Sequence, residues 1–308
     1  MKLFFAPLQG YTDAAYRIFH NEIYPGCIDS YYTPFLRLEH GEPRNKDLLE
    51  LEVENPSIKV VPQIIVKDLF EFKILVSVLL DRGCSEIDLN MGCPFPLQVK
   101  KGRGAGLMSN KDKVFEILNE ISKVQEVSFS IKMRLGNDDN AQWRSFCREI
   151  NSTPLRHITI HPRIATQQYR GDIDMNSFDE IYNSINHKIV YNGDVLTINK
   201  IVELEEKYPQ LEGVMIGRGL LARPSLAFEY KNGIELTHQQ QIEELIILHN
   251  KLYSFYSSKL QGESHLLTKM KTYWDYSEPI IGHKTYKQIK KASSIFKYNN
   301  VVNSLNKA

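Results

Sequence analysis

The chain has 308 residues, of which 42% are hydrophobic and 24% charged, with a formal net charge of +1. This balance excludes a strongly basic nucleic-acid-binding protein. No apolar run approaches the roughly 18 residues that span a bilayer, and the first residues lack the layout of a signal peptide, so we expect a cytoplasmic protein. The four cysteines form no C-x-x-C pair, which argues against a disulfide framework or a metal site.

Eight short apolar segments alternate with helical patterns over the first 230 residues or so. They are rich in β-branched residues, as is typical of parallel strands buried on both faces. Their residues are 3–8, 28–35, 60–66, 87–89, 129–133, 158–160, 189–191 and 214–216. Amphipathic helices are predicted between them, for example at 111–124 and 197–208. The pattern predicts an α/β fold, a (β/α)8 TIM barrel of ~250 residues. A doubly wound open sheet is the alternative, weakened by the lack of a G-x-G-x-x-G motif after the first strand.

The pattern changes after Pro224, where only helical segments follow. We therefore predict a catalytic barrel at residues 1–233 and a small all-helical domain at residues 234–308. From Leu236 onward the chain has ten lysines, no arginine and five acidic residues. This excess indicates a polyanionic partner, although a solvated helical surface would look the same. Lys269 and Lys271 stand among aromatic residues and Lys290 lies in a second basic stretch, which suits RNA, while core packing is the alternative for the aromatics.

Nearly every predicted strand ends in a polar or glycine residue. In a TIM barrel the active site lies at the carboxyl ends of the strands, so these residues should meet at one rim. In chain order they are Pro7, Leu8 and Gln9; Gln63; Asn90 with Cys93; Lys132 and Arg134; His161 and Arg163; Asn192, Gly193 and Asp194; and Gly217 with Arg218.

The last two turns favour a phosphate site. Glycine-containing turns after strands seven and eight usually bind phosphate in this fold, and Arg218 adds a positive charge. Lys132 could face an anionic ring, and the amide of Gln63 can both donate and accept, as a flavin edge requires. Together these residues indicate a phosphorylated aromatic cofactor. FMN fits better than pyridoxal phosphate, which needs a Schiff-base lysine and an acidic partner, but these residues alone leave both open.

Several ordered blocks carry a family resemblance across the predicted barrel. "APLQGYTDAAYR", "DLNMGCP", "GRGAGLM", "KMRLG", "HPRIATQQYRGD", "NGDV" and "VMIGRGLLARP" together resemble the tRNA-dihydrouridine synthases. The resemblance implies an FMN enzyme that uses NADPH to reduce the C5–C6 double bond of a uracil in tRNA. The short basic C-terminal segment is similar to that family's RNA-binding domain, and most similar to the bacterial C-type, which acts on the D-loop.

The resemblance also assigns roles to residues. Hydride would pass from the flavin to C6 of the uracil, and Cys93 would donate the proton to C5; a thiol with a pKa near ~8.5 is largely protonated at neutral pH. Asn90 would orient the uracil. The flavin would contact Pro7, Leu8, Gln9, Gln63, Lys132, His161, Asn192, Gly193, Asp194, Gly217 and Arg218. The tRNA would contact Lys100, Arg103, Arg134, Arg163, Lys269, Lys271 and Lys290. The chain departs from the family at Leu8, Gln9 and Pro162.

Two other functions stay open at this point. One is a flavin-dependent reductase of a free pyrimidine or another small unsaturated substrate, which would not need the basic helical segment. The other is an RNA-binding protein without redox chemistry, which would not need Cys93. The remaining cysteines, Cys27, Cys84 and Cys147, are interpreted as small hydrophobic residues. A monomer acting on one tRNA is the expected assembly.

Overall fold

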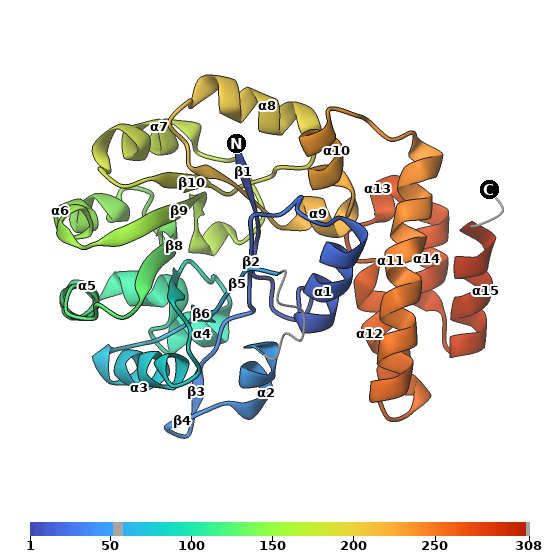
Figure 1. The fold of residues 1–308 in the computed structure, drawn as a ribbon, viewed down its shortest axis with the longest axis horizontal. Coiled ribbons are helices and arrows are strands. Elements are labelled where there is room, and N and C mark those ends of the chain that lie inside the picture. Colours follow the sequence, from blue (N-terminus) through green and yellow to red (C-terminus); the bar gives the residue numbers. More distant parts are fainter. Residues whose placement is uncertain (52–57, 306–308) are drawn as a thin grey trace.

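The computed structural model of the chain describes residues 1–51 and 58–305. Its main sheet is entirely parallel, with the order β5-β2-β1-β11-β10-β9-β8-β7-β6 (Figure 1). The strands are β1 Lys2–Phe5, β2 Ser30–Tyr32, β5 Val60–Val61, β6 Gln63–Ile64, β7 Glu86–Met91, β8 Ser128–Gly136, β9 Leu155–Ile164, β10 Ile189–Tyr191 and β11 Gly213–Ile216.

The two ends of this sheet are joined, so it forms a closed barrel. Only Pro62 separates β5 from β6, and because proline has no N–H it interrupts the ladder for one residue. β5 pairs with β2 and β6 pairs with β7, so residues 60–64 act as one strand between the two ends. The described chain therefore has the eight barrel strands expected, and the predicted TIM barrel is confirmed. The short antiparallel hairpin of β3 (Leu38–Glu39) and β4 (Glu42–Pro43) was not expected.

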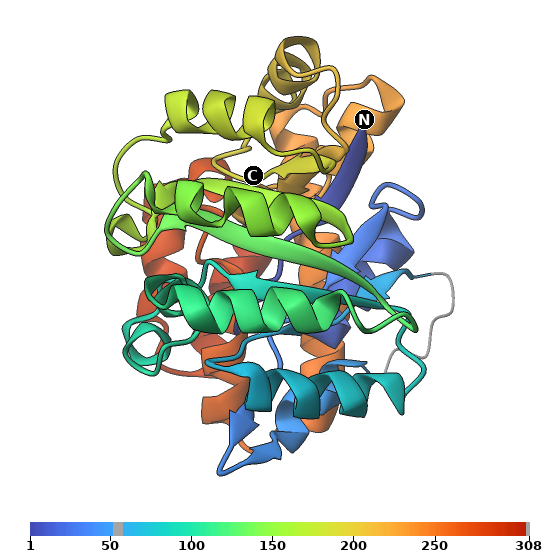
Figure 2. The ribbon, with the colours of Figure 1, turned by 90° about the vertical axis from the view of Figure 1, so that its left-hand side faces the viewer.

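Helices cover the outside of the barrel, and α3, α5, α6 and α7 face the viewer in Figure 2. Five begin at an Asp, Asn or Thr side chain that accepts from the backbone N–H three residues on, at Asp13, Asp68, Asn110, Asp174 and Thr197, which satisfies an otherwise unpaired donor. The helices are α1 Ala14–Ile23, α2 Asn45–Leu48, α3 Leu69–Leu80, α4 Pro96–Lys100, α5 Lys111–Ile121, α6 Cys147–Ser152, α7 Met175–Ser184, α8 Ile198–Lys207, α9 Arg218–Ala222 and α10 Leu226–Asn232, with 3-10 turns η1 Leu49–Leu51, η2 Gly104–Ser109, η3 Gln142–Phe146 and η4 Ala165–Gln167.

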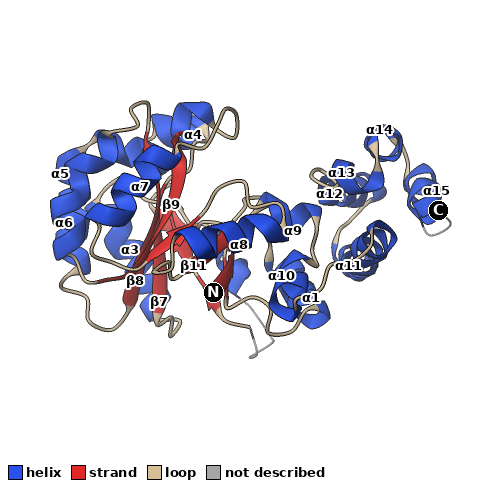
Figure 3. Ribbon diagram, turned by 90° about the horizontal axis from the view of Figure 1, so that it is seen from above, coloured by secondary structure: helices blue, strands red, loops and turns tan. Residues whose placement is uncertain are grey.

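Five further helices, which we call the C-terminal helices, lie on one side of the barrel (Figures 1 and 3). They are α11 His238–Lys259, α12 Glu263–Tyr273, α13 Glu278–Ile281, α14 His283–Lys291 and α15 Ile295–Leu305. Their core contains Trp274, whose Nε1 donates to Tyr298 Oη at 2.8 Å. Whether residues 234–308 fold as a separate domain stays a prediction. None of the helices in the described residues is both long and apolar enough to span a bilayer.

Polar and aromatic contacts fasten the C-terminal helices to the first βα unit. The carboxylate of Asp13, which also caps α1, accepts from Tyr256 Oη at 2.7 Å and forms an ion pair with Lys269 at 2.7 Å. Tyr24 Oη donates to Glu244 at 2.6 Å. These bonds fix the helices beside the end of β1, where the loop that contains Tyr11 begins.

Candidate active site

A cavity of about 700 Å³ opens at the carboxyl ends of the barrel strands. Its volume lies within the roughly 300–1,000 Å³ typical of cofactor and ligand sites. Residues from the strand β8 and from the loops after β1, β2, β7, β9, β10 and β11 line it. The predicted site residues that line it are Pro7, Leu8, Gln9, Asn90, Cys93, Lys132, Arg134, His161, Asn192, Gly193, Asp194, Gly217 and Arg218. The expected convergence of strand ends is therefore present.

Cys93 stands on the cavity wall just beyond β7. Its backbone N–H donates to Asn90 Oδ1 at 2.8 Å, and its carbonyl accepts from the N–H of Ala105 in η2 at 3.1 Å. Burial raises the pKa of the Cys93 thiol, while the charges of Arg134 and Lys132 oppose that rise. The thiol is therefore protonated at neutral pH, as a proton donor must be.

The glycine-rich stretch after Cys93 allows close packing against the cysteine. Gly104 has φ +60°, and a Cβ there would lie 2.8 Å from Cys93 Cβ. A Cβ on Gly106 would lie 2.4 Å from the carbonyl oxygen of Val99. Only glycine accommodates both the left-handed backbone and these approaches. These two glycines thus hold η2 behind the cysteine.

Arg103, in the same stretch, is 5% exposed and points away from solvent. Its Nε donates to Glu71 at 2.9 Å, and an Nη donates to the carbonyl of Leu38 at 3.0 Å. This buried arginine therefore ties the loop to α3 and β3. Its expected contact with tRNA stays a prediction. Lys100, at the end of α4, is exposed.

Gln63 is fully buried and is not among the residues that line the cavity. Its Nε2 donates to Asp88 at 2.7 Å, and its Oε1 accepts from Asn90 at 2.7 Å. Its side chain thus lies one layer below the cavity wall, so the expected contact with the cofactor stays a prediction.

Lys132, Arg134 and His161 line the middle of the cavity. Burial, helped by the charge of Arg134, lowers the pKa of Lys132 to about 8. Burial also lowers the pKa of His161 well below its usual value, and the surrounding cations act in the same direction. The imidazole is therefore neutral. Because the Arg163 guanidinium can only donate, His161 Nε2, at 3.3 Å, is its acceptor, and the ring proton is on Nδ1.

Asp194 organises the loop after β10. Its carboxylate is bonded to the guanidinium groups of both Arg163 and Arg218. Although burial would raise its pKa, these arginines hold the pKa of Asp194 below the usual value. Arg163 is 2% exposed and also donates to the Gly171 carbonyl at 2.7 Å. Arg163 therefore holds Asp194 in place, and its expected contact with tRNA stays a prediction.

Two of the predicted RNA-binding lysines form internal ion pairs. Lys269 pairs with Asp13, and Lys290 with Asp275. Within residues 1–51 and 58–305, no ion pair to an acidic side chain is found for Lys100 or Lys271. Lys271 is half-buried and Lys100 exposed. The RNA-binding role of all four lysines stays a prediction.

The structure adds cavity residues that were not predicted, chiefly Tyr169, Tyr276, Phe95 and Arg37. The Tyr169 ring lies under two guanidinium groups, 4.6 Å from Arg218 and 5.5 Å from Arg134. Its position inside the block "HPRIATQQYRGD" could have indicated it. Tyr276 lies in the turn between α12 and α13 and packs against Tyr11 with ring centres 5.3 Å apart, a contact that no local sequence pattern predicts.

The charge of the cavity suits a phosphorylated ligand. The charged lining residues are four cations, Arg37, Lys132, Arg134 and Arg218, and one carboxylate, Asp194. Arg218 stands at the first position of α9, directly after the Gly217 turn. A guanidinium beside glycine turns at the last two strands is the usual phosphate site of TIM barrels. The residues present therefore fit a flavin mononucleotide.

Comparison with known proteins identifies the family. The family model "Dihydrouridine synthase (Dus)" matches residues 4–307. A "Probable tRNA-dihydrouridine synthase" of Staphylococcus aureus is 29% identical over 259 residues, covering 82% of this chain and 77% of that protein. A "Probable tRNA-dihydrouridine synthase 2" of Bacillus subtilis is 26% identical over 265 residues, covering 82% and 78%.

Solved structures share the fold. The old yellow enzyme of Trypanosoma cruzi superimposes with a TM-score of 0.55 at 9% identity, covering 77% of this chain and 89% of its own. Morphinone reductase gives 0.50, also at 9%, with 77% and 87% covered. Such low identity shows the barrel alone. The family assignment comes from the match that spans almost the whole sequence: this chain belongs to the dihydrouridine synthase (Dus) family.

Proposed function

We propose that this protein reduces the C5–C6 double bond of a specific uridine in tRNA to 5,6-dihydrouridine, with FMN as the resident cofactor and NADPH as the reductant. The observation that carries the proposal is the position of Cys93 on the wall of a cationic cavity, in a chain that matches the family from residue 4 to residue 307.

The cofactor would be held by residues from both halves of the barrel. Gly193, Gly217 and Arg218 would bind its phosphate, and Pro7, Leu8 and Lys132 would lie along its ring system. When bound, the flavin supplies the hydride that adds to C6 of the uracil. Lys132 is partly deprotonated near neutral pH because its pKa is about 8. Both its ammonium and its amine form have N–H bonds, and each can donate a hydrogen bond.

Cys93 would supply the proton that completes the reduction. As hydride reaches C6, the π electrons of the C5–C6 bond collect at C5, and the thiol proton is transferred there. The raised pKa keeps this proton in place until C5 becomes basic. Arg134 and Lys132, which lower that pKa against the effect of burial, then stabilise the thiolate until solvent returns a proton.

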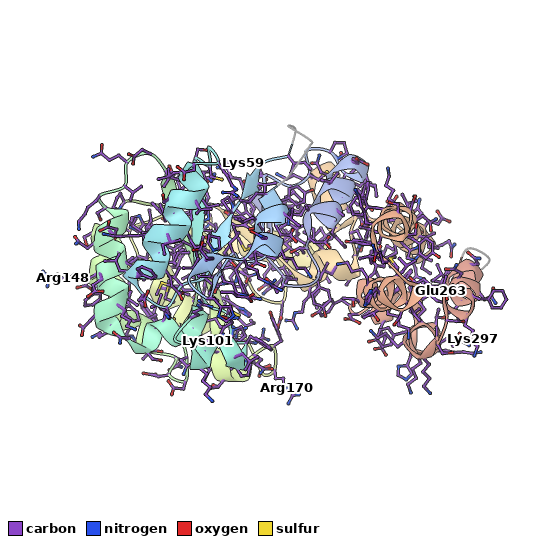
Figure 4. The ribbon with its side chains drawn as sticks, turned by 90° about the horizontal axis from the view of Figure 1, so that it is seen from below. Lys59, Lys101, Arg148, Arg170, Glu263 and Lys297 are labelled. Atoms are coloured by element: carbon purple, nitrogen blue, oxygen red, sulfur yellow. The ribbon has the colours of Figure 1, made fainter. Side chains whose placement is uncertain are left out.

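The target uridine must leave the tRNA fold to enter the cavity, because its ring cannot reach Cys93 while it is stacked. Cations on the outside of the mouth would guide the backbone. Lys101 and Arg170 are both exposed and project from the same edge of the barrel in Figure 4. We infer that Lys100, Lys269, Lys271 and Lys290 extend this contact, with Lys269 and Lys290 first exchanging their carboxylate partners.

Mass-spectrometric mapping of unmodified tRNA, incubated with the purified protein, FMN and NADPH, tests the proposal. Dihydrouridine at one defined position is the expected result, and we infer a position in the D-loop. Equal reduction of free uridine, unaffected by removal of residues 236–308, would instead establish a small-molecule reductase. Binding of tRNA with no reduction of any substrate would contradict the redox function itself.

A further inference from the structure

A chain of buried hydrogen bonds runs from the backbone of Cys93 to a carboxylate inside the barrel. Asp88, on β7, is fully buried, and its two oxygens accept from Gln63 Nε2 at 2.7 Å and Ser130 Oγ at 2.6 Å. Gln63 Oε1 accepts from Asn90 Nδ2 at 2.7 Å. Asn90 Oδ1 accepts from the N–H of Cys93 at 2.8 Å. Every donor in this chain points toward Asp88.

The carboxylate determines which way both amides face. Burial raises the pKa of Asp88 to about 6, a rise that the bonds from Gln63 and Ser130 limit, so the group is ionised at neutral pH. An ionised carboxylate only accepts. Gln63 must therefore turn its NH₂ toward Asp88 and its oxygen toward Asn90, and Asn90 must in turn face Gln63 with its NH₂.

With the two amides oriented in this way, Asn90 can donate one N–H bond to a ligand in the cavity. Its Oδ1 already accepts from two backbone N–H groups, those of Gly92 at 3.0 Å and of Cys93. One of its two N–H bonds is used by Gln63. No bond is found for the other among the described residues, and because Asn90 lines the cavity, this N–H can be offered to a ligand there. A donor that faces position 4 of a pyrimidine favours the carbonyl of uracil over the amino group of cytosine, whereas position 2 is a carbonyl in both bases.

We propose that Asp88 is a positioning residue, which acts through Gln63 to lock Asn90 as a hydrogen-bond donor toward a carbonyl of the uracil. Asp88 does not line the cavity, so it acts only through the side chains between. The inference rests on the proposed function, because it concerns how the uracil is held in the cavity. It predicts that this recognition depends on a carboxylate one layer below the wall.

The substitution Asp88→Leu removes both acceptors at similar volume. In the flavin-loaded protein we expect formation of dihydrouridine in tRNA to fall about 10- to 100-fold, as follows from the loss of one oriented hydrogen bond. The matched control is Ser130→Ala, which removes the other bond to the same carboxylate but leaves the path to Asn90 intact. It should stay within about twofold of the wild-type rate.

A double-mutant cycle with Asn90→Ala separates positioning from general damage. If Asp88 acts through Asn90, Asp88→Leu should change the rate of the Asn90→Ala protein by less than about twofold. Losses that multiply would overturn the inference, as would a Ser130→Ala loss equal to that of Asp88→Leu. If Asp88→Leu fails to retain flavin, Asp88→Asn keeps one acceptor oxygen, and its rate should lie between those of Asp88→Leu and the wild type; a rate at or below that of Asn90→Ala would contradict the inference.

A second readout is the choice of substrate. Sulfur accepts hydrogen bonds more weakly than oxygen, so the wild-type protein should prefer uridine to 2-thiouridine or 4-thiouridine at the target position. Asp88→Leu should reduce that preference, and an unchanged preference for both analogues would contradict the role of Asp88. Absence of dihydrouridine with the wild-type protein would instead overturn the proposed function, so the two failures are distinguishable.

Discussion

The barrel mouth and the C-terminal helices differ in how they use positive charge. At the mouth, Arg37 pairs with Glu39 and Arg218 with Asp194, but among the described residues no ion pair is found for Lys132 or Arg134. In the C-terminal helices, Lys269 and Lys290 have a carboxylate each, from Asp13 and Asp275. A cation without an acidic partner at the mouth is therefore a stronger indication of a ligand site than a lysine that already has a carboxylate partner. The predictions below test this contrast.

The largest expected effect is at Cys93. Cys93→Ala removes the proton donor but no contact that a flavin or tRNA requires, so the rate of dihydrouridine formation should fall about 10²- to 10⁴-fold while both ligands still bind. Single-turnover reduction of tRNA by the reduced protein measures this step directly.

Cys84 provides the matched control for that experiment. It precedes β7, whereas Cys93 follows the same strand, so the two cysteines lie at opposite ends of it. Cys84→Ala should therefore retain the wild-type rate. A Cys93→Ala protein that reduces tRNA as fast as the wild type would show that another group is the acid.

Arg218 should affect retention of the cofactor. In Arg218→Gln we expect FMN to bind about 10- to 100-fold more weakly, because a charge-assisted bond to phosphate is lost. Binding of riboflavin, which has no phosphate, should change little. Arg144, exposed on η3 and paired with Glu180, is the control position. Equal losses for FMN and riboflavin would place the phosphate elsewhere.

The same contrast explains what could be predicted from the sequence. In a closed parallel barrel the last residues of every strand lie at one rim. Cys93, Asn192 and Arg218 could therefore be assigned to the cavity rim from their positions after strands alone. The length and β-branched character of the apolar runs likewise sufficed for the strands and the fold.

The sequence could not reveal how deeply each side chain is buried or which distant side chains it contacts. Arg103 and Arg163 have the right identity and the right position along the chain, yet each is directed into the protein by a carboxylate, Glu71 or Asp194, that lies far away in sequence. Tyr276 reaches the cavity only because α11 and α12 dock against the first βα unit. Such contacts depend on tertiary packing, which residue order does not reveal.

Lys132 should show the effect of a buried cation on stability. Its folded pKa of about 8 lies below the unfolded value of ~10.4, so protonation is disfavoured in the folded state. The resulting penalty is absent above the unfolded pKa, grows as the pH falls toward 8, and is fully present below 8. Flavin-free Lys132→Met should therefore melt about 2–4 °C higher than the wild type at pH 7, with a smaller gap at pH 9.5. A gap that widens with rising pH would contradict the depressed pKa.

Lys100 should contribute to the affinity for tRNA by releasing counterions from the RNA backbone. It is exposed at the end of α4 and, among the described residues, has no acidic partner. If it contacts a phosphate, Lys100→Ala should reduce the slope of log affinity for tRNA against log salt by about one unit. Titrations at several salt concentrations measure the slope, and an unchanged slope would remove Lys100 from the interface.

The smallest effect is expected at Lys290. This position gives the most direct test of the contrast between the mouth and the C-terminal helices. Its partner Asp275 also accepts from Tyr11 Oη at 2.9 Å, so the carboxylate keeps a bond when the lysine is lost. Because the pair is partly exposed, Lys290→Ala should lower the free energy of unfolding by only about 0–1 kcal/mol. If the ion pair persists in the complex, the salt slope for tRNA should not change. A slope reduced as much as in Lys100→Ala would mean that the ion pair between Lys290 and Asp275 opens when RNA binds. Lys290 would then contact a phosphate, and the C-terminal helices would bind ligand with their cations as the mouth does.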